Sequence, residues 1–94
     1  MLVNSETVKN ETGIFWNDSQ TEKRINRYIE QGKAFLREHA GNENLEFDEN
    51  TTEGALLIHY VEYAYYKKSE YFEQNYKSDL IWLRFKHKEN DDEQ

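Results

Sequence analysis

A run at residues 55–66 constrains the fold of this chain more than any other feature. Every position in it is apolar or aromatic except His59 and Glu62. Those two lie three residues apart, so on a helix they share one narrow stripe with apolar groups around the rest. We therefore expect a helix buried on several sides. A 94-residue chain has little else to cover it, because a domain of this size hides only about 60 to 65% of its unfolded surface. We expect a second copy or another partner to supply the missing cover.

The composition is typical of one folded domain spanning residues 1–94. Charged residues make up 33% and aromatic residues 15% of the chain, which suits a domain with aromatic contact surfaces. There is no cysteine, which excludes disulfides, thiol catalysis and thiolate metal sites. No stretch approaches the roughly 20 apolar residues of a membrane span, and the N-terminus lacks a secretory pattern. We expect a soluble protein with no membrane partner.

The pattern predicts an all-α fold, a small bundle of three to four helices with a C-terminal arm that is either helical or extended. Residues 1–17 would hold a short helix beginning at Ser5, then an aromatic segment at 14–16 pinned onto the core. Residues 18–86 would form the helical core. Residues 87–94 would be a mobile acidic tail.

The second predicted helix has the clearest pattern. Ser19 and Glu22 form a capping-box pattern, and Gly41 would end the helix. Its inward stripe at i, i+3, i+4 spacing consists of Ile25, Tyr28, Ile29, Gly32, Phe35, Leu36 and His39. Gly32 on this stripe indicates either a close approach by another helix or a tolerated glycine.

The remaining elements leave alternatives open. Leu45 and Phe47 would anchor the loop at 42–51, after which Thr51 or Thr52 caps the buried helix. A further helix would start at Ser69 or Ser78. Residues 81–86 alternate in part, so they predict either a helix or a short strand.

No pattern for catalysis or metal binding is present. His39, His59 and His87 are twenty or more residues apart, and none has a histidine four residues away. The four glycines are isolated, so no phosphate loop is predicted. We expect no enzymatic activity, no cofactor, and no catalytic, cofactor-binding or metal-ligating residue. His59 is interpreted as a core or interface histidine.

Aromatic residues crowd the second half of the chain. Tyrosine is favoured at interfaces because it brings contact area at low entropic cost together with a hydroxyl group, although several of these residues would also close a small core. The predicted interface residues are Tyr60, Tyr63, Tyr65, Tyr66, Tyr71, Phe72, Tyr76, Ile81, Trp82, Leu83 and Phe85.

The net charge of −7 argues against tight binding of nucleic acid, which needs lysine and arginine to neutralise phosphates. The compact basic clusters are small, at 23–24, 67–68 and 86–88. We expect an assembly of such subunits to repel DNA.

Several stretches together resemble the small helical head-tail connector proteins of tailed phages. The similarity covers about residues 19–85 and consists of helix and core patterns. The stretches are TEKRINRYIEQGKAFL at 21–36, AG at 40–41, LEF at 45–47, the tyrosine-rich run at 55–66 and YFEQNY at 71–76.

The resemblance implies a structural role without enzymatic activity. Such connectors form a ring beneath the portal of the capsid, extend the DNA channel and present a platform to the next neck protein. It implies a homo-oligomeric ring matching the portal symmetry, for which we expect twelve copies, with the portal protein and a downstream stopper protein as partners. DNA would pass through without specific binding. The location implied is the virion neck, after assembly in the cytoplasm of the bacterial host. The alternative is a small acidic regulator that binds a host protein.

Overall fold

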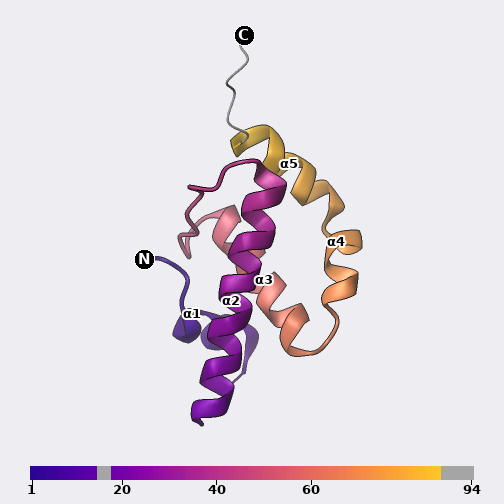
Figure 1. Cartoon of the computed structure of the whole chain (residues 1–94). Coiled ribbons are helices and arrows are strands. Elements are labelled where there is room, and N and C mark those ends of the chain that lie inside the picture. Colours follow the sequence, from indigo (N-terminus) through magenta and orange to yellow (C-terminus); the bar gives the residue numbers. More distant parts are fainter. Residues whose placement is uncertain (15–17, 88–94) are drawn as a thin grey trace.

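The computed structural model describes residues 1–14 and 18–87, which form five α-helices and one 3₁₀ turn (Figure 1). The predicted all-α fold is confirmed. Figure 1 shows the longest helix running through the molecule, with the first helix beside its beginning and the last beside its end. In chain order the elements are α1 (Ser5–Thr12), α2 (Ser19–Ala40), α3 (Thr52–Tyr65), η1 (Ser69–Tyr71), α4 (Phe72–Asn75) and α5 (Lys77–His87).

Helix α2 begins one residue earlier than the capping pattern predicts. Asp18, not Ser19, is the N-cap, and its carboxylate accepts a hydrogen bond of 2.8 Å from the backbone N–H of Thr21. Glu22 is therefore one position too late to complete a capping box. The helix ends as predicted, at Gly41, whose φ of 71° is the left-handed conformation that glycine adopts without strain.

Glu22 joins α2 to α1 instead of capping its own helix. Its carboxylate lies 2.8 Å from Lys9 Nζ and accepts a hydrogen bond from the hydroxyl of Ser5. Ser5 is thus a tertiary contact, and the N-cap of α1 is Asn4, whose side chain accepts from the N–H of Thr7. The helix predicted from Ser5 is confirmed, but in both helices the N-cap is the residue before the predicted serine.

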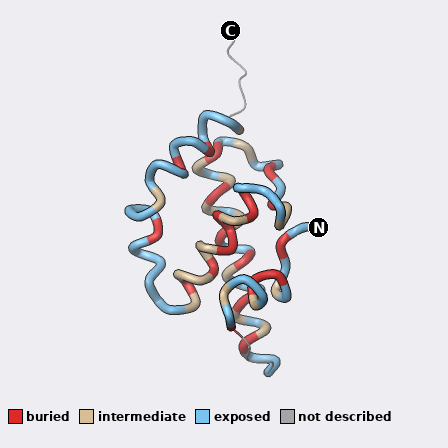
Figure 2. The backbone as a smooth tube through the Cα atoms, turned by 180° about the vertical axis from the view of Figure 1, so that it is seen from behind, coloured by how far each residue is buried: buried red, intermediate tan, exposed pale blue. Residues whose placement is uncertain are grey.

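Helix α3 is the buried run, and its own chain covers it more fully than the sequence predicts (Figure 2). Thr51 caps it through a hydrogen bond of 3.1 Å from the N–H of Gly54. Leu57 and Tyr60 lie against Gly32 of α2, so of the two alternatives for this glycine the close helix approach is the one that the structure has. Every apolar side chain within α3 is buried or half-buried. Within the single chain, α3 therefore leaves less apolar surface uncovered than the sequence predicts, and cover by a partner stays a prediction.

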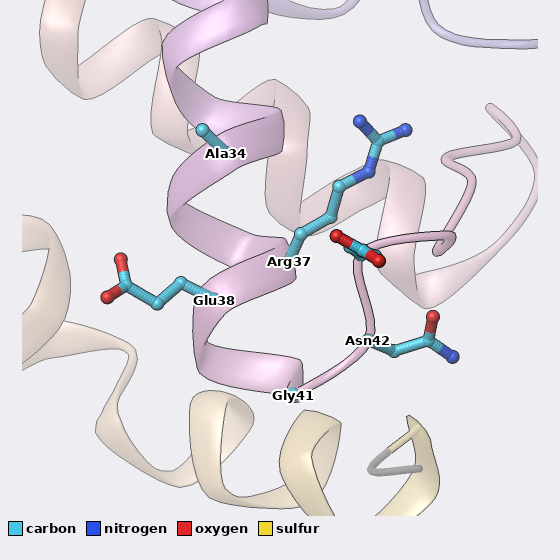
Figure 3. Close-up of a pocket in the computed structure, with 6 residues that line it drawn as sticks. Ala34, Arg37, Glu38, Gly41 and Asn42 are labelled. Atoms are coloured by element: carbon cyan, nitrogen blue, oxygen red, sulfur yellow. The ribbon is translucent and has the colours of Figure 1, made fainter.

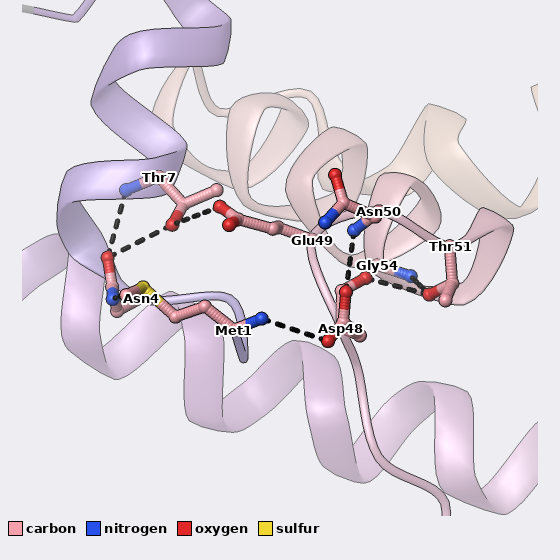
Figure 4. Close-up of polar contacts among 8 residues, drawn as sticks. All are labelled: Met1, Asn4, Thr7, Asp48, Glu49, Asn50, Thr51 and Gly54. Atoms are coloured by element: carbon pink, nitrogen blue, oxygen red, sulfur yellow. Dashed lines mark hydrogen bonds and ion pairs between the residues drawn. The ribbon is translucent and has the colours of Figure 1, made fainter.

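The loop before α3 is held by the first residues of the chain. Leu45 and Phe47 are buried, as predicted. The N–H of Val3 donates to the carbonyl of Phe47 at 2.9 Å, and the terminal ammonium of Met1 lies 3.0 Å from a carboxylate oxygen of Asp48 (Figure 4). This short antiparallel pairing has no signature in the sequence.

The segment at 81–86 is helical, so the alternative of a strand or an extended arm is wrong for these residues. Leu80 and Leu83 are buried three residues apart, which is a helical spacing, and α5 packs on α2. His87, predicted to start a mobile tail, is the last residue of α5. The rest of that tail, at 88–94, and the aromatic pair at 15–16 lie outside the described residues.

Candidate functional site

The eleven predicted interface residues fall into three structural groups. Phe72 and Leu83 are completely buried. Tyr60, Tyr63, Tyr65 and Tyr76 are half-buried, and five side chains are exposed, namely Tyr66, Tyr71, Ile81, Trp82 and Phe85. The exposed fractions decide which of them a partner can reach.

Phe72 and Leu83 are core residues, which corrects the prediction that they form an interface. The ring of Phe72 stacks on Tyr76 at 4.7 Å between centroids and meets Tyr60 and Tyr63 edge-on at 5.3 and 5.7 Å. A side chain enclosed in this way is not accessible to a partner. Its role is to hold the tyrosines around it in place.

Tyr60 and Tyr65 belong to contacts between α2 and α3. Tyr60 packs on Phe35 at 5.3 Å, and burial raises the pKa of its hydroxyl. The ring of Tyr65 lies under the guanidinium of Arg24 at 4.7 Å, a cation–π contact. Both are mainly structural in the single chain.

The remaining tyrosines line an open groove of about 790 Å³ between the C-terminal half of α3 and the segment of η1 and α4. We call it the tyrosine groove. A space of this size suits a small molecule or a few large side chains. Its lining consists of His59, Glu62, Tyr63, Tyr66, Lys68, Tyr71, Asn75 and Tyr76.

Contacts between the lining residues fix the shape of the tyrosine groove. The amide of Asn75 donates to the hydroxyl of Tyr63 at 3.2 Å, and the imidazole of His59 stacks on Tyr76 at 5.5 Å. Burial, and then the neighbouring Tyr63 and Glu62, raise the pKa of the Tyr76 hydroxyl. The groove therefore presents aromatic walls with neutral hydroxyl groups, an arrangement suited to binding aromatic or aliphatic side chains.

A second exposed surface lies on α5. Ile81, Trp82 and Phe85 are 51%, 38% and 87% exposed. Phe85 follows Ile81 by four residues and Trp82 by three, so the three side chains form one stripe on the side of α5 opposite Leu80 and Leu83. We call this stripe the α5 apolar face.

The α5 apolar face is held in position by the end of its helix. Lys86 Nζ lies 5.0 Å from the ring centroid of Trp82 and 3.0 Å from the carboxylate of Glu53 in the first turn of α3. His87 pairs with the same carboxylate. Sequence reasoning missed this contact, because nothing in the pattern relates residues 34 positions apart.

A hollow of about 560 Å³ at the end of α2 is less suited to binding (Figure 3). Figure 3 shows Ala34, Arg37, Glu38, Gly41 and Asn42 around it. Arg37, its main cationic group, already donates from Nε to the carbonyl of Leu45 at 2.8 Å and lies over Phe47. The hollow is therefore the outer side of the contact that Arg37 makes with the loop at 42–51.

Across residues 1–14 and 18–87, no three histidine, aspartate or glutamate side chains converge so that they could hold a metal ion. In the same ranges, no helix combines the length and apolarity needed to cross a bilayer. The absence of enzymatic activity and of a cofactor stays a prediction.

Comparison with protein-family models, curated proteins and solved structures finds no match to this chain. The resemblance to phage connectors therefore stays a prediction from the sequence. The tyrosine groove and the α5 apolar face are the two surfaces of the described residues best suited to binding a partner.

Proposed function

We propose that this chain is a structural, non-enzymatic ring subunit, the head-tail connector of a tailed phage or prophage. In this role a ring of copies, twelve if it follows the portal, extends the DNA channel beneath the portal in the virion neck. It also docks the next neck protein. Assembly would take place in the cytoplasm of the bacterial host.

The observation that carries the proposal is the exposure of the α5 apolar face after the chain has enclosed a core of its own. Phe85 is 87% exposed, whereas Leu80 and Leu83 on the opposite side of the same helix are buried. An isolated exposed apolar residue is ordinary, but three on one stripe of a helix are typical of an interaction surface.

The arrangement of the two surfaces also supports a ring. The α5 apolar face and the tyrosine groove are made by different elements. Contacts between two different surfaces of identical subunits are heterologous, and they close into a ring when the rotation allows. The net charge of −7 suits a channel for DNA, because an anionic wall offers no binding sites for phosphates.

The mass of the purified protein, alone and mixed with a portal protein, tests the proposal. Light scattering and electron microscopy should show weak self-association alone and a closed ring on the portal. Trp82→Glu and Tyr66→Glu should abolish the ring while the circular dichroism of the helices persists. Tyr66 is a sharper choice than Tyr63, because Tyr63 also packs on Phe72 in the core. Unchanged assembly by both variants would contradict the proposal.

The alternative function, an acidic regulator of a host protein, has one observation in its favour. Glu11 of α1, Glu49 of the loop and Glu62 of α3 line a single crevice of about 130 Å³. A regulator that uses this acidic surface would form a one-to-one complex with a basic partner. The same mass measurement separates it from a ring.

A further inference from the structure

The α5 apolar face has a defined charge pattern. With about 100° between successive residues of a helix, Phe85 lies at the centre of the exposed side, between Ile81 and Trp82. Lys77 and Arg84 follow on the side of Ile81, and Lys86 on the side of Trp82, where its ammonium contacts the indole ring. Exposed Asp79 lies next to Lys86 on the side of Trp82, and Lys86 is paired with Glu53. The face is therefore an apolar stripe with one cationic border, formed by Lys77 and Arg84.

The tyrosine groove has a complementary pattern. Its walls are aromatic, and Glu62 lines it. Glu70 is exposed on η1, the element that supplies Tyr71 to the groove, whereas Glu73 of α4 lies 3.9 Å from His39 of α2. Lys68 offsets one of the two charges of Glu62 and Glu70. The cationic border of the α5 apolar face suits an aromatic groove with Glu62 and Glu70 beside it, because opposite charges at the rim set orientation and partner choice.

We infer that the α5 apolar face of one copy docks into the tyrosine groove of the next copy. Phe85 enters the groove between Tyr66, Tyr71 and Tyr76, and Ile81 and Trp82 cover its edges. Lys77 and Arg84 approach Glu62 and Glu70. This inference rests on the proposed ring and names the contact from which the ring is built.

The face and the groove lie apart on the same chain. Leu80 and Leu83 are buried in the core on one side of α5, so Phe85 on the opposite side points away from its own subunit. The groove opens between α3 and the η1–α4 segment. Each copy therefore offers one face and one groove, and joining them leaves a free face at one end and a free groove at the other.

A membrane surface is a poorer partner for the α5 apolar face, because the net charge of −7 opposes binding to anionic lipid.

Single-cysteine variants test the contact directly, since the chain has no cysteine of its own. Phe85→Cys and Tyr71→Cys are purified separately and treated with a short bis-maleimide cross-linker, alone and mixed. The mixture should give a covalent dimer at least about tenfold more abundant than either variant alone. A matched control mixes Ala34→Cys, at an exposed site on α2, with Tyr71→Cys, and should give background levels.

Disabling variants supply the second readout. Phe85→Glu and Tyr71→Glu should each be unable to form chains or rings, yet mixed together they retain one intact face and one intact groove and should form a dimer. Efficient cross-linking of Phe85→Cys to itself would overturn the inference, because it indicates a symmetric contact. So would the absence of any dimer in the mixtures, or binding to anionic vesicles that Phe85→Glu abolishes.

The outcomes also separate this inference from the proposed function. If rings form on the portal while Phe85→Glu and Tyr71→Glu still assemble, the ring stands and this contact is wrong. If the mixed variants form the dimer but no ring forms on a portal, the contact stands and the connector function is wrong.

Discussion

The carboxylate of Glu53 in the first turn of α3 pairs with the imidazole of His87, the last residue of α5. Glu53 is only 4% exposed, and Lys86 reaches the same carboxylate at 3.0 Å. The pairing joins the start of one helix to the end of another. Because Trp82 and Phe85 lie within about a turn and a half of it, it also fixes the direction of the α5 apolar face.

Replacing Glu53 by glutamine should destabilise the fold in a pH-dependent way. Burial alone would raise the pKa of Glu53, but hydrogen bonds from His87 and Lys86 outweigh it and lower the pKa from 4.5 to about 2. The carboxylate therefore contributes stability in full above pH 4.5, and this is lost as the pH falls through about 2. Near neutral pH we expect Glu53→Gln to lower the free energy of unfolding by about 3 kcal/mol, measured by urea unfolding.

The control for this effect is Glu38→Gln, at an exposed carboxylate on α2. Its unfolding free energy should stay within about 0.5 kcal/mol of the wild type across the same pH range. The difference between wild type and Glu53→Gln should shrink steadily below pH 4.5. A difference that does not change with pH would show that lost packing, not lost charge, causes the destabilisation.

Replacing the adjacent residues Tyr71 and Phe72 should have different effects, one on assembly and the other on folding. Phe72 is completely buried and Tyr71 is 49% exposed. Phe72→Ala should lower the unfolding free energy by about 3 to 5 kcal/mol, because it leaves a cavity among Tyr60, Tyr63 and Tyr76. Tyr71→Ala should change it by less than about 0.5 kcal/mol and should weaken only the proposed self-association. Thermal melts and light scattering measure the two effects, and equal destabilisation would argue against this division.

The helices could be predicted from the sequence because their apolar spacing is long and regular. The N-cap residues were harder to predict. Asn4 and Ser5 are neighbours that cap a helix equally well, and so are Asp18 and Ser19. In α1 a tertiary contact favours Asn4 as the N-cap, because the hydroxyl of Ser5 donates a hydrogen bond to Glu22 instead. Local pattern does not contain that information.

The site could be predicted as a region but not residue by residue. Residues 69–76 form a 3₁₀ turn and one turn of helix, too short for a periodic pattern to separate buried Phe72 from exposed Tyr71. Asn75 and Lys68, which complete the groove, carry no signal in the sequence beyond proximity to the tyrosines. The same shortness explains why α4, a helix of four residues, is added among the described residues to the three to four helices predicted.

Gly32 should be preferred over alanine despite its poor helix propensity. A Cβ atom there would lie 2.7 Å from Leu57 Cδ1 and 2.8 Å from Tyr60 Cδ1. Alanine gains about 1 kcal/mol of helix propensity, but overpacking costs about 1 to 3 kcal/mol, so we expect Gly32→Ala to destabilise by about 1 kcal/mol. Ala34→Gly, exposed two residues later, isolates the propensity effect and should cost about 1 kcal/mol. A stabilised Gly32→Ala variant would mean that α2 and α3 pack less closely than the structure indicates.

The wild-type protein should not shift duplex DNA at moderate salt. Its net charge is −7, and several of its cations are already engaged, with Lys9 on Glu22 and Lys86 on Glu53. Binding to the DNA backbone depends on free cations that displace counterions from phosphates, so few contacts remain available. Micromolar binding in a gel-shift assay would contradict this expectation.

A triple variant of the acidic crevice, Glu11→Lys, Glu49→Lys and Glu62→Lys, brings the net charge to −1 and places three new cations together. It should bind DNA weakly at low salt and release it as salt rises, because the contact would be purely electrostatic.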